Sequence, residues 1–118
     1  MSSFKVPLKI DQGGTFQKVV TWKAGTPATP VDLTGCSALA HIRAKISSPT
    51  TLLELSTSDG TITLGDDAGT VTIAIDAETT AAITWTQAVY DLEIYFPDGT
   101  VRRLLSGTVT VSPEVTRD

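Results

Sequence analysis

Segments in which apolar and polar residues alternate one by one recur along this chain, with turn-forming residues between them. A period of two places every second side chain on one face of a strand and does not fit a helix. The most regular segment is 89–96, where four apolar side chains would share one face: Tyr90, Leu92, Ile94 and Phe96. Thr, Val and Ile, whose branched Cβ atoms favour strands, make up 38 of the 118 residues. The pattern therefore predicts an all-β fold.

Other segments carry a strand pattern of the same kind. We expect further strands at 6–10, 15–22, 36–46, 52–57, 61–64 and 70–75, and a last strand from 101 to 111. Two of these segments have a clearly apolar inward face, made of Ala38, Ala40, Ile42, Ala44 and Ile46 in one and of Val71, Ile73 and Ile75 in the other. The period breaks at 77–83, which predicts one short helix near residues 77–83 with Asp76 as its N-cap.

Two Asp-Gly pairs predict tight turns between strands. Asp59-Gly60 suits a two-residue hairpin that joins 52–57 to 61–64, because both residues tolerate positive φ. Pro97-Asp98-Gly99 suits a three-residue hairpin after the segment 89–96. Each turn would set the register of the strands that flank it.

The second turn predicts how the last strands pair. It sets three cross-strand pairs, Tyr95–Val101, Glu93–Arg103 and Leu92–Leu104. Glu93 and Arg103 would then form an ion pair on the outer face. A bulge at Gly107 would turn Val109 and Val111 toward the core, and Leu105 would stay on the outer face with Tyr95 and Val101.

We therefore expect a single domain, residues 1–118, folded as an immunoglobulin-like antiparallel β-sandwich of about eight strands with one short helix. The predicted helix precedes Tyr90, near the start of the penultimate strand, much as the tyrosine corner does in such sandwiches. A closed β-barrel is the alternative architecture.

Reactive side chains are scarce in this sequence. His41 is the only histidine and Cys36 the only cysteine, and their odd spacing on one predicted strand places them on opposite faces. A zinc site needs three or four ligands and a catalytic triad needs a base, so we expect no metal, no cofactor and no catalytic residue. Asp91 and Glu93 share one face, where we expect them to pair with basic side chains of adjacent strands.

Charge and hydropathy argue against two further classes of partner. The formal net charge is −4, whereas nucleic-acid binding usually depends on a basic excess. The first residues have no apolar stretch typical of a signal peptide, and no apolar run approaches the roughly 20 residues of a membrane helix. We expect neither a nucleic-acid partner nor a membrane.

Several short motifs follow one another in order along nearly the whole chain: Pro7-Leu8-Lys9-Ile10, Gly13-Gly14-Thr15-Phe16, Val31-Asp32-Leu33-Thr34-Gly35, Ile42-Arg43, Ala77-Glu78-Thr79-Thr80, Tyr90-Asp91-Leu92-Glu93 and the stretch from Gly107 to Arg117. This ordered series resembles small virion proteins of tailed bacteriophages. It is similar to the N-terminal sandwich of phage baseplate upper proteins and to short tail or neck proteins. The resemblance implies a structural protein that is assembled into the virion in the bacterial host cytoplasm.

The expected role is therefore a non-enzymatic structural component of a phage tail, baseplate or neck. It would dock to other virion proteins and to copies of itself, without a small-molecule substrate. The candidate interface residues come from the first strand, the last hairpin and the C-terminal tail: Phe4, Val6, Leu8, Tyr95, Val101, Leu105 and Val115. Two alternatives are a capsid decoration protein and a carbohydrate-binding module, which would need Trp22 or Trp85 exposed.

Overall fold

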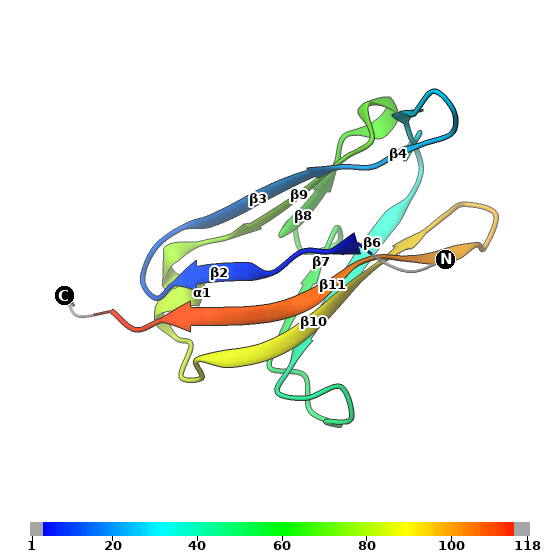
Figure 1. Ribbon diagram of the computed structural model, residues 1–118. Coiled ribbons are helices and arrows are strands. Elements are labelled where there is room, and N and C mark those ends of the chain that lie inside the picture. Colours follow the sequence, from blue (N-terminus) through cyan, green and yellow to red (C-terminus); the bar gives the residue numbers. More distant parts are fainter. Residues whose placement is uncertain (1–3, 115–118) are drawn as a thin grey trace.

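The computed structural model describes residues 4–114 of the chain, and β-structure dominates it (Figure 1). Of these residues, 51% lie in strands and 7% in short helical turns. The strands form two sheets that pack together and a small two-stranded ribbon. The prediction of an all-β fold is confirmed.

Eleven strands and two helical turns follow one another along the described chain. The strands are β1 (Phe4–Lys5), β2 (Leu8–Asp11), β3 (Phe16–Thr21), β4 (Lys23–Ala24), β5 (Thr29–Pro30), β6 (Ser37–Arg43), β7 (Leu53–Ser56), β8 (Ile62–Leu64), β9 (Thr70–Ile75), β10 (Gln87–Tyr95) and β11 (Val101–Ser112). The helical turns are η1 (Asp66–Ala68) and α1 (Ala77–Ala81).

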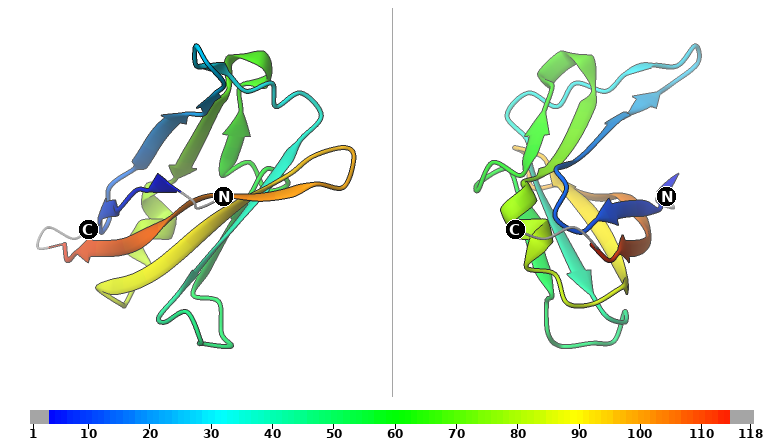
Figure 2. Two further views of the ribbon diagram at one scale, coloured as in Figure 1. Left: turned by 45° about the vertical axis from the view of Figure 1, so that its right-hand side comes forward. Right: turned by 90° about the vertical axis from the view of Figure 1, so that its left-hand side faces the viewer.

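The larger sheet has six strands in the order β1-β11-β10-β6-β7, with β2 also paired to β11. β1 and β2 run parallel to β11, whereas the other neighbours are antiparallel. The second sheet has the antiparallel order β3-β9-β8, and β4 pairs with β5 in the ribbon. Figures 1 and 2 show the smaller sheet packed over one face of the larger one, with α1 at one end. Within residues 4–114 no strand pairing joins the two sheets, so they do not close into a barrel.

The core lies between the sheets and takes its side chains from alternate strand positions. Six of the predicted inward residues of β6 and β9 are buried: Ala38, Ala40, Ile42, Val71, Ile73 and Ile75. Ala44 and Ile46, which we expected on the same face, are exposed, and Ile46 is 90% exposed. That part of the prediction is wrong because β6 ends at Arg43 and the chain then leaves the sheet in a loop.

The hairpin between β10 and β11 has the predicted turn. The Phe96 N–H donates to the Thr100 carbonyl (2.8 Å), and Gly99 has a positive φ of 92°. Tyr95 lies opposite Val101 and Glu93 lies opposite Arg103, as predicted.

The bulge in β11 occurs at Leu104 and not at Gly107. Leu92 lies opposite Leu105, whereas Glu93 lies opposite Arg103, so Leu104 is the extra residue. The extra residue shifts the alternation of β11 by one position, and both Leu104 and Leu105 are buried. The predicted Leu92–Leu104 pair and the outward position of Leu105 are therefore wrong.

The Asp59-Gly60 turn connects the two sheets and does not form the predicted hairpin. β7 pairs with β6 in the larger sheet, and β8 pairs with β9 in the smaller one. Gly60 supplies the expected positive φ of 85°, and the Asp59 carboxylate accepts a hydrogen bond from the Thr61 N–H (2.9 Å). The same local turn can serve a hairpin or a crossover, and only the pairing partners of the flanking strands distinguish them.

The helix α1 begins at Ala77 with the predicted N-cap. The Asp76 carboxylate accepts a hydrogen bond from the Thr79 N–H at 2.8 Å. The helix ends at Ala81, before the predicted end at 83. The buried Thr80 hydroxyl donates to the Gly14 carbonyl at 2.8 Å, so the helix holds the turn between β2 and β3.

Tyr90 and Gly107 together position the N-terminal segment on the larger sheet. The two residues lie opposite each other on β10 and β11. The Tyr90 hydroxyl donates to the Val6 carbonyl at 2.6 Å, a contact across 84 residues and not the local bond of a tyrosine corner. Burial raises the pKa of Tyr90 to about 12, which keeps the hydroxyl protonated as a donor. Glycine at position 107 leaves room for the backbone of Val6. A Cβ at this position would lie 2.8 Å from the Val6 carbonyl oxygen.

We expect Gly107→Ala to lower the free energy of unfolding by about 1–3 kcal/mol, because the new methyl group displaces backbone of the N-terminal segment. Urea denaturation followed by circular dichroism measures the loss. Thr110→Ala, an exposed position on the same strand, is the control and should change stability by less than about 0.5 kcal/mol. Gly107→Ala and Tyr90→Phe both act through Val6, so their effects should not add; full additivity would contradict this coupling.

Candidate docking surface

The face of the larger sheet that points away from the core carries the candidate site. On β6 and β10, even-numbered residues are buried and odd-numbered residues reach solvent. The strand register places these side chains beside those of β7 and β11. We call this surface the outer face; its residues are Leu39, His41, Arg43, Glu54, Val89, Asp91, Glu93, Tyr95, Val101 and Arg103.

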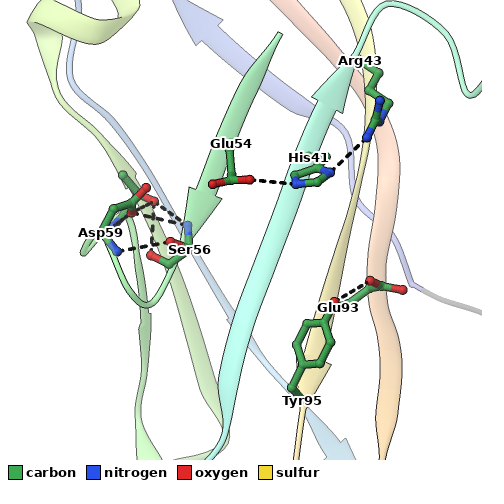
Figure 3. A network of polar contacts seen from close by, with 8 residues as sticks. His41, Arg43, Glu54, Ser56, Asp59, Glu93 and Tyr95 are labelled. Carbon is green, nitrogen blue, oxygen red and sulfur yellow. Dashed lines mark hydrogen bonds and ion pairs between the residues drawn. The ribbon is translucent and has the colours of Figure 1, made fainter. Parts of the chain in front are cut away.

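A chain of polar contacts links β7 and β6 on the outer face (Figure 3). His41 Nε2 lies 3.0 Å from Glu54 Oε1, and Arg43 Nη2 lies 3.2 Å from His41 Nδ1. Because a guanidinium group can only donate, Nδ1 accepts from Arg43, and Nε2 carries the proton that is donated to Glu54. Arg43 Nη1 also donates to the Ser48 carbonyl at 2.9 Å. The contacts hold these side chains in one arrangement on the rigid sheet.

The acidic residues of β10 make separate contacts. Arg103 lies opposite Glu93, but its Nε pairs with Asp91 Oδ2 at 3.5 Å. Glu93 instead accepts a hydrogen bond from the Tyr95 hydroxyl at 3.0 Å, and this bond raises the pKa of Tyr95 (Figure 3). The predicted ion pair between Glu93 and Arg103 is therefore wrong. The Asp91–Arg103 pair is 45% and 59% exposed and adds at most about 1 kcal/mol.

Apolar side chains gather at the hairpin end of the outer face. Val101 is 47% exposed and lies opposite Tyr95. Leu39 of β6 lies opposite Glu93 of β10 and is half-buried. A hollow of about 430 Å³ lies beside Tyr95 and Leu39. Its other lining residues include four with hydroxyl groups: Ser37, Ser56, Thr57 and Ser58.

A tight polar turn forms one border of this hollow. Ser56 and Asp59 hold it, since the Asp59 N–H donates to the Ser56 hydroxyl at 3.1 Å (Figure 3). Burial acts to raise the pKa of Asp59, but hydrogen bonds from Thr61 and Ser56 outweigh burial and lower it. The ionised carboxylate therefore remains available to hold the turn beside the hollow.

The predicted interface residues outside the last turn differ in how far they are exposed to solvent. Phe4 is 50% exposed and Val6 is half-buried. Leu8 and Leu105 are 1% and 0% exposed, so as surface contacts both predictions are wrong. The pairing of β2 with β11 places Leu8 in the core, and the bulge at Leu104 turns Leu105 inward opposite Leu92. Val115 lies outside the described residues.

Leu39 is an apolar residue of the outer face that is not among the predicted interface residues. The alternation in the segment 36–46 already places it outward, beside His41. Its position near Tyr95 follows only from the pairing of β6 with β10, where Leu39 lies opposite Glu93 and Ser37 lies opposite Tyr95.

The tryptophans occupy different environments. Trp22 is 6% exposed and packs edge-to-face on Phe96, with ring centroids 6.1 Å apart. Trp85 is half-buried and lines a groove beside α1. Trp85 is therefore the tryptophan that a ligand could reach.

Other reactive groups form no cluster in the part of the chain that the structure describes. Cys36 is half-buried against the core, and burial raises the pKa of its thiol. Among residues 4–114, no group of three or more His, Cys, Asp or Glu side chains could hold a metal ion. No helix in this range is long and apolar enough to cross a membrane.

No model of a known protein family matches this chain, and no curated protein matches its sequence at a significant level.

Proposed function

We propose that this protein is a non-enzymatic structural component of a bacteriophage tail, baseplate or neck, which docks to copies of itself and to other virion proteins through the outer face. The ordered motifs that resemble phage virion proteins support the phage assignment. Its place would be the virion, after assembly in the cytoplasm of the bacterial host.

The fold proposed for this role is an immunoglobulin-like sandwich. In that fold one sheet contains strands G, F, C and C′, and the other contains B, E and D. The neighbouring strands β11-β10-β6-β7 and the sheet β3-β9-β8 support this assignment, with β3 as B and β11 as G. Since many functions share this fold, the surface and not the fold has to carry the functional argument.

The observation that carries the proposal is the composition of the outer face. Its apolar end joins Tyr95, Val101 and Leu39, and beside it lie charged side chains that already have hydrogen-bond or ion-pair partners within the protein. Protein interfaces typically combine aromatic, aliphatic and arginine side chains with a polar rim. Charged groups that already have such partners cost less to bring into an interface than isolated ones.

The sheet edges favour docking by the face over docking by strand addition. Pro7 precedes β2, where it cannot donate a ladder hydrogen bond, and Lys9 is exposed on the same edge strand. Lys18 is exposed on β3, the edge strand of the smaller sheet. Proline and lysine on edge strands are common means of blocking edge-to-edge pairing.

Val101→Asp tests the outer face, because it introduces a charge at an apolar contact position. We expect it to weaken self-association and binding to purified phage tails by at least about 30-fold, as for a residue at the centre of an interface. Analytical ultracentrifugation and co-sedimentation with tails measure these effects. Val19→Asp is the matched control: Val19 is 53% exposed on β3, and this variant should bind as the wild type does.

Binding to separated phage heads and tails distinguishes the two structural roles. Binding to isolated heads and not to tails would replace the proposal with a capsid decoration protein. Binding to neither fraction, together with absence of the protein from purified virions by mass spectrometry, would reject a structural role. Equal losses of binding for Val101→Asp and Val19→Asp would show that the contact does not lie on the outer face.

A further inference from the structure

A second surface with its own chemistry lies beside α1. A groove of about 640 Å³ separates the helix and the residues that follow it from the start of β7. Apolar side chains contribute much of its lining: Leu52, Leu53, Ile83 and Trp85. Of these, Ile83 is 7% exposed, whereas the other three are half-buried and can still be covered.

The charged side chains that line the groove are acidic. They are Asp76 and Glu78, both exposed, and none of the described lining residues is basic. Hydrogen bonds from Thr79 lower the pKa of Asp76, so this carboxylate is ionised at neutral pH. Neither carboxylate takes part in an ion pair within the described chain. A ligand that covers the groove therefore meets unneutralised negative charge beside apolar surface.

Trp85 adds a third feature. The face of an indole ring attracts cations, most often a guanidinium group, by about 0.5–1 kcal/mol at exposed sites. Leu52 and Leu53 offer aliphatic surface on the other side of the groove. A neutral apolar ligand would leave the carboxylates unpaired, and an anionic ligand would be repelled. Charge complementarity thus selects a cationic segment with an apolar side chain.

We propose that this groove binds a peptide segment of a neighbouring protein that carries Arg or Lys next to an aliphatic residue. The cation would pair with Asp76 and Glu78 and lie near Trp85, and the aliphatic side chain would cover Leu52 and Leu53. Trp85 precedes β10, whereas Tyr95 ends it, so the groove and the apolar end of the outer face are about 30 Å apart along one strand. The protein would then connect one partner bound at the groove with another bound at the outer face. Binding of the peptide at the groove would not require a partner on the outer face.

The probes are two peptides added to the full chain, acetyl-Leu-Arg-Leu-Arg-amide and the acidic counterpart acetyl-Leu-Glu-Leu-Glu-amide. Binding is followed by ¹⁵N NMR at the Thr79 and Thr84 amides and the Trp85 indole. The arginine peptide should shift these signals in a saturable way, and the glutamate peptide should not. The combined variant Asp76→Asn/Glu78→Gln should weaken binding about tenfold, as two partly exposed ion pairs are lost. Asn also caps helices well, so this variant keeps the start of α1.

The control removes the same charge elsewhere. Asp66→Asn/Asp67→Asn in η1 should bind the arginine peptide as the wild type does. Equal binding of both peptides, or equal losses in both double variants, would overturn the proposal. The proposal would also be overturned if maltohexaose shifted these NMR signals and the arginine peptide did not. That result would make the groove a carbohydrate site. Val101→Asp should leave peptide binding unchanged, so failure at the groove and failure at the outer face are distinguishable.

Discussion

Leu105→Ala will lower the free energy of unfolding by about 2–5 kcal/mol. Leu105 is 0% exposed and lies opposite Leu92, which is also 0% exposed, in the centre of the larger sheet. Removing its side chain leaves a cavity between the two sheets that a close-packed core fills only in part. Urea denaturation monitored by tryptophan fluorescence measures the loss.

Val101→Ala is the control for this experiment, because Val101 is 47% exposed on the same strand. It should change stability by less than about 0.5 kcal/mol. The pair tests the bulge at Leu104 directly, since without the bulge Leu105 would share the outer face with Val101. A similar small loss for both variants would contradict the register described for β11.

Trp22→Ala will lower the free energy of unfolding by about 3–5 kcal/mol, the range found for large aromatic side chains in cores. Trp22 is 6% exposed and contacts Phe96 edge-to-face. Its indole N–H is buried and has no hydrogen-bond partner among residues 4–114. Burial of an unpaired donor is unfavourable, so the stabilisation comes from packing of the ring and not from the N–H.

Trp22→Phe separates these contributions. It keeps an aromatic ring and removes the unpaired donor, so we expect a loss of less than about 2 kcal/mol. Thermal and urea denaturation followed by circular dichroism compare the two variants without relying on the altered tryptophan signal. A loss for Trp22→Phe as large as for Trp22→Ala would show that the N–H contributes a bond that the described contacts lack.

Local patterns in the sequence predict individual elements well. The alternation of Tyr90, Leu92 and Ile94 gives a strand in which these three side chains are buried, whereas Phe96, predicted on the same face, follows the strand and is half-buried. Asp76 caps α1 as expected, because the cap depends on residues within one helical turn. The Pro97-Asp98-Gly99 turn also sets the first pairs of its hairpin, Tyr95–Val101 among them.

Non-local pairing accounts for the errors. Asp59-Gly60 has the local chemistry of a hairpin, yet the strands on either side of it join different sheets. The bulge falls at Leu104 because Leu105 packs into the core opposite Leu92, while Gly107 remains in register to leave room for Val6. The residues next to Leu104 and Gly107 in the sequence do not include these packing partners. The local sequence therefore cannot decide which of the two positions carries the bulge.

The candidate site divides in the same way. Tyr95 and Val101 lie opposite each other because a short turn joins their strands, and the sequence predicts this pair. Leu39 and the polar chain from Glu54 to Arg43 join them only because β6 lies between β10 and β7. The groove beside α1 likewise combines Leu52 and Leu53 with residues that follow β9.

The sequence alone determined an all-β chain, most of its strands, the α-helix that Asp76 caps and most of the faces that enter the core, because each depends on side-chain alternation or on hydrogen bonds between near neighbours. The tertiary structure decided which strands pair, where β11 bulges and which side chains meet on the outer face and in the groove. These features depend on packing between segments far apart in the chain, where many pairings satisfy the local pattern and only one buries the whole core.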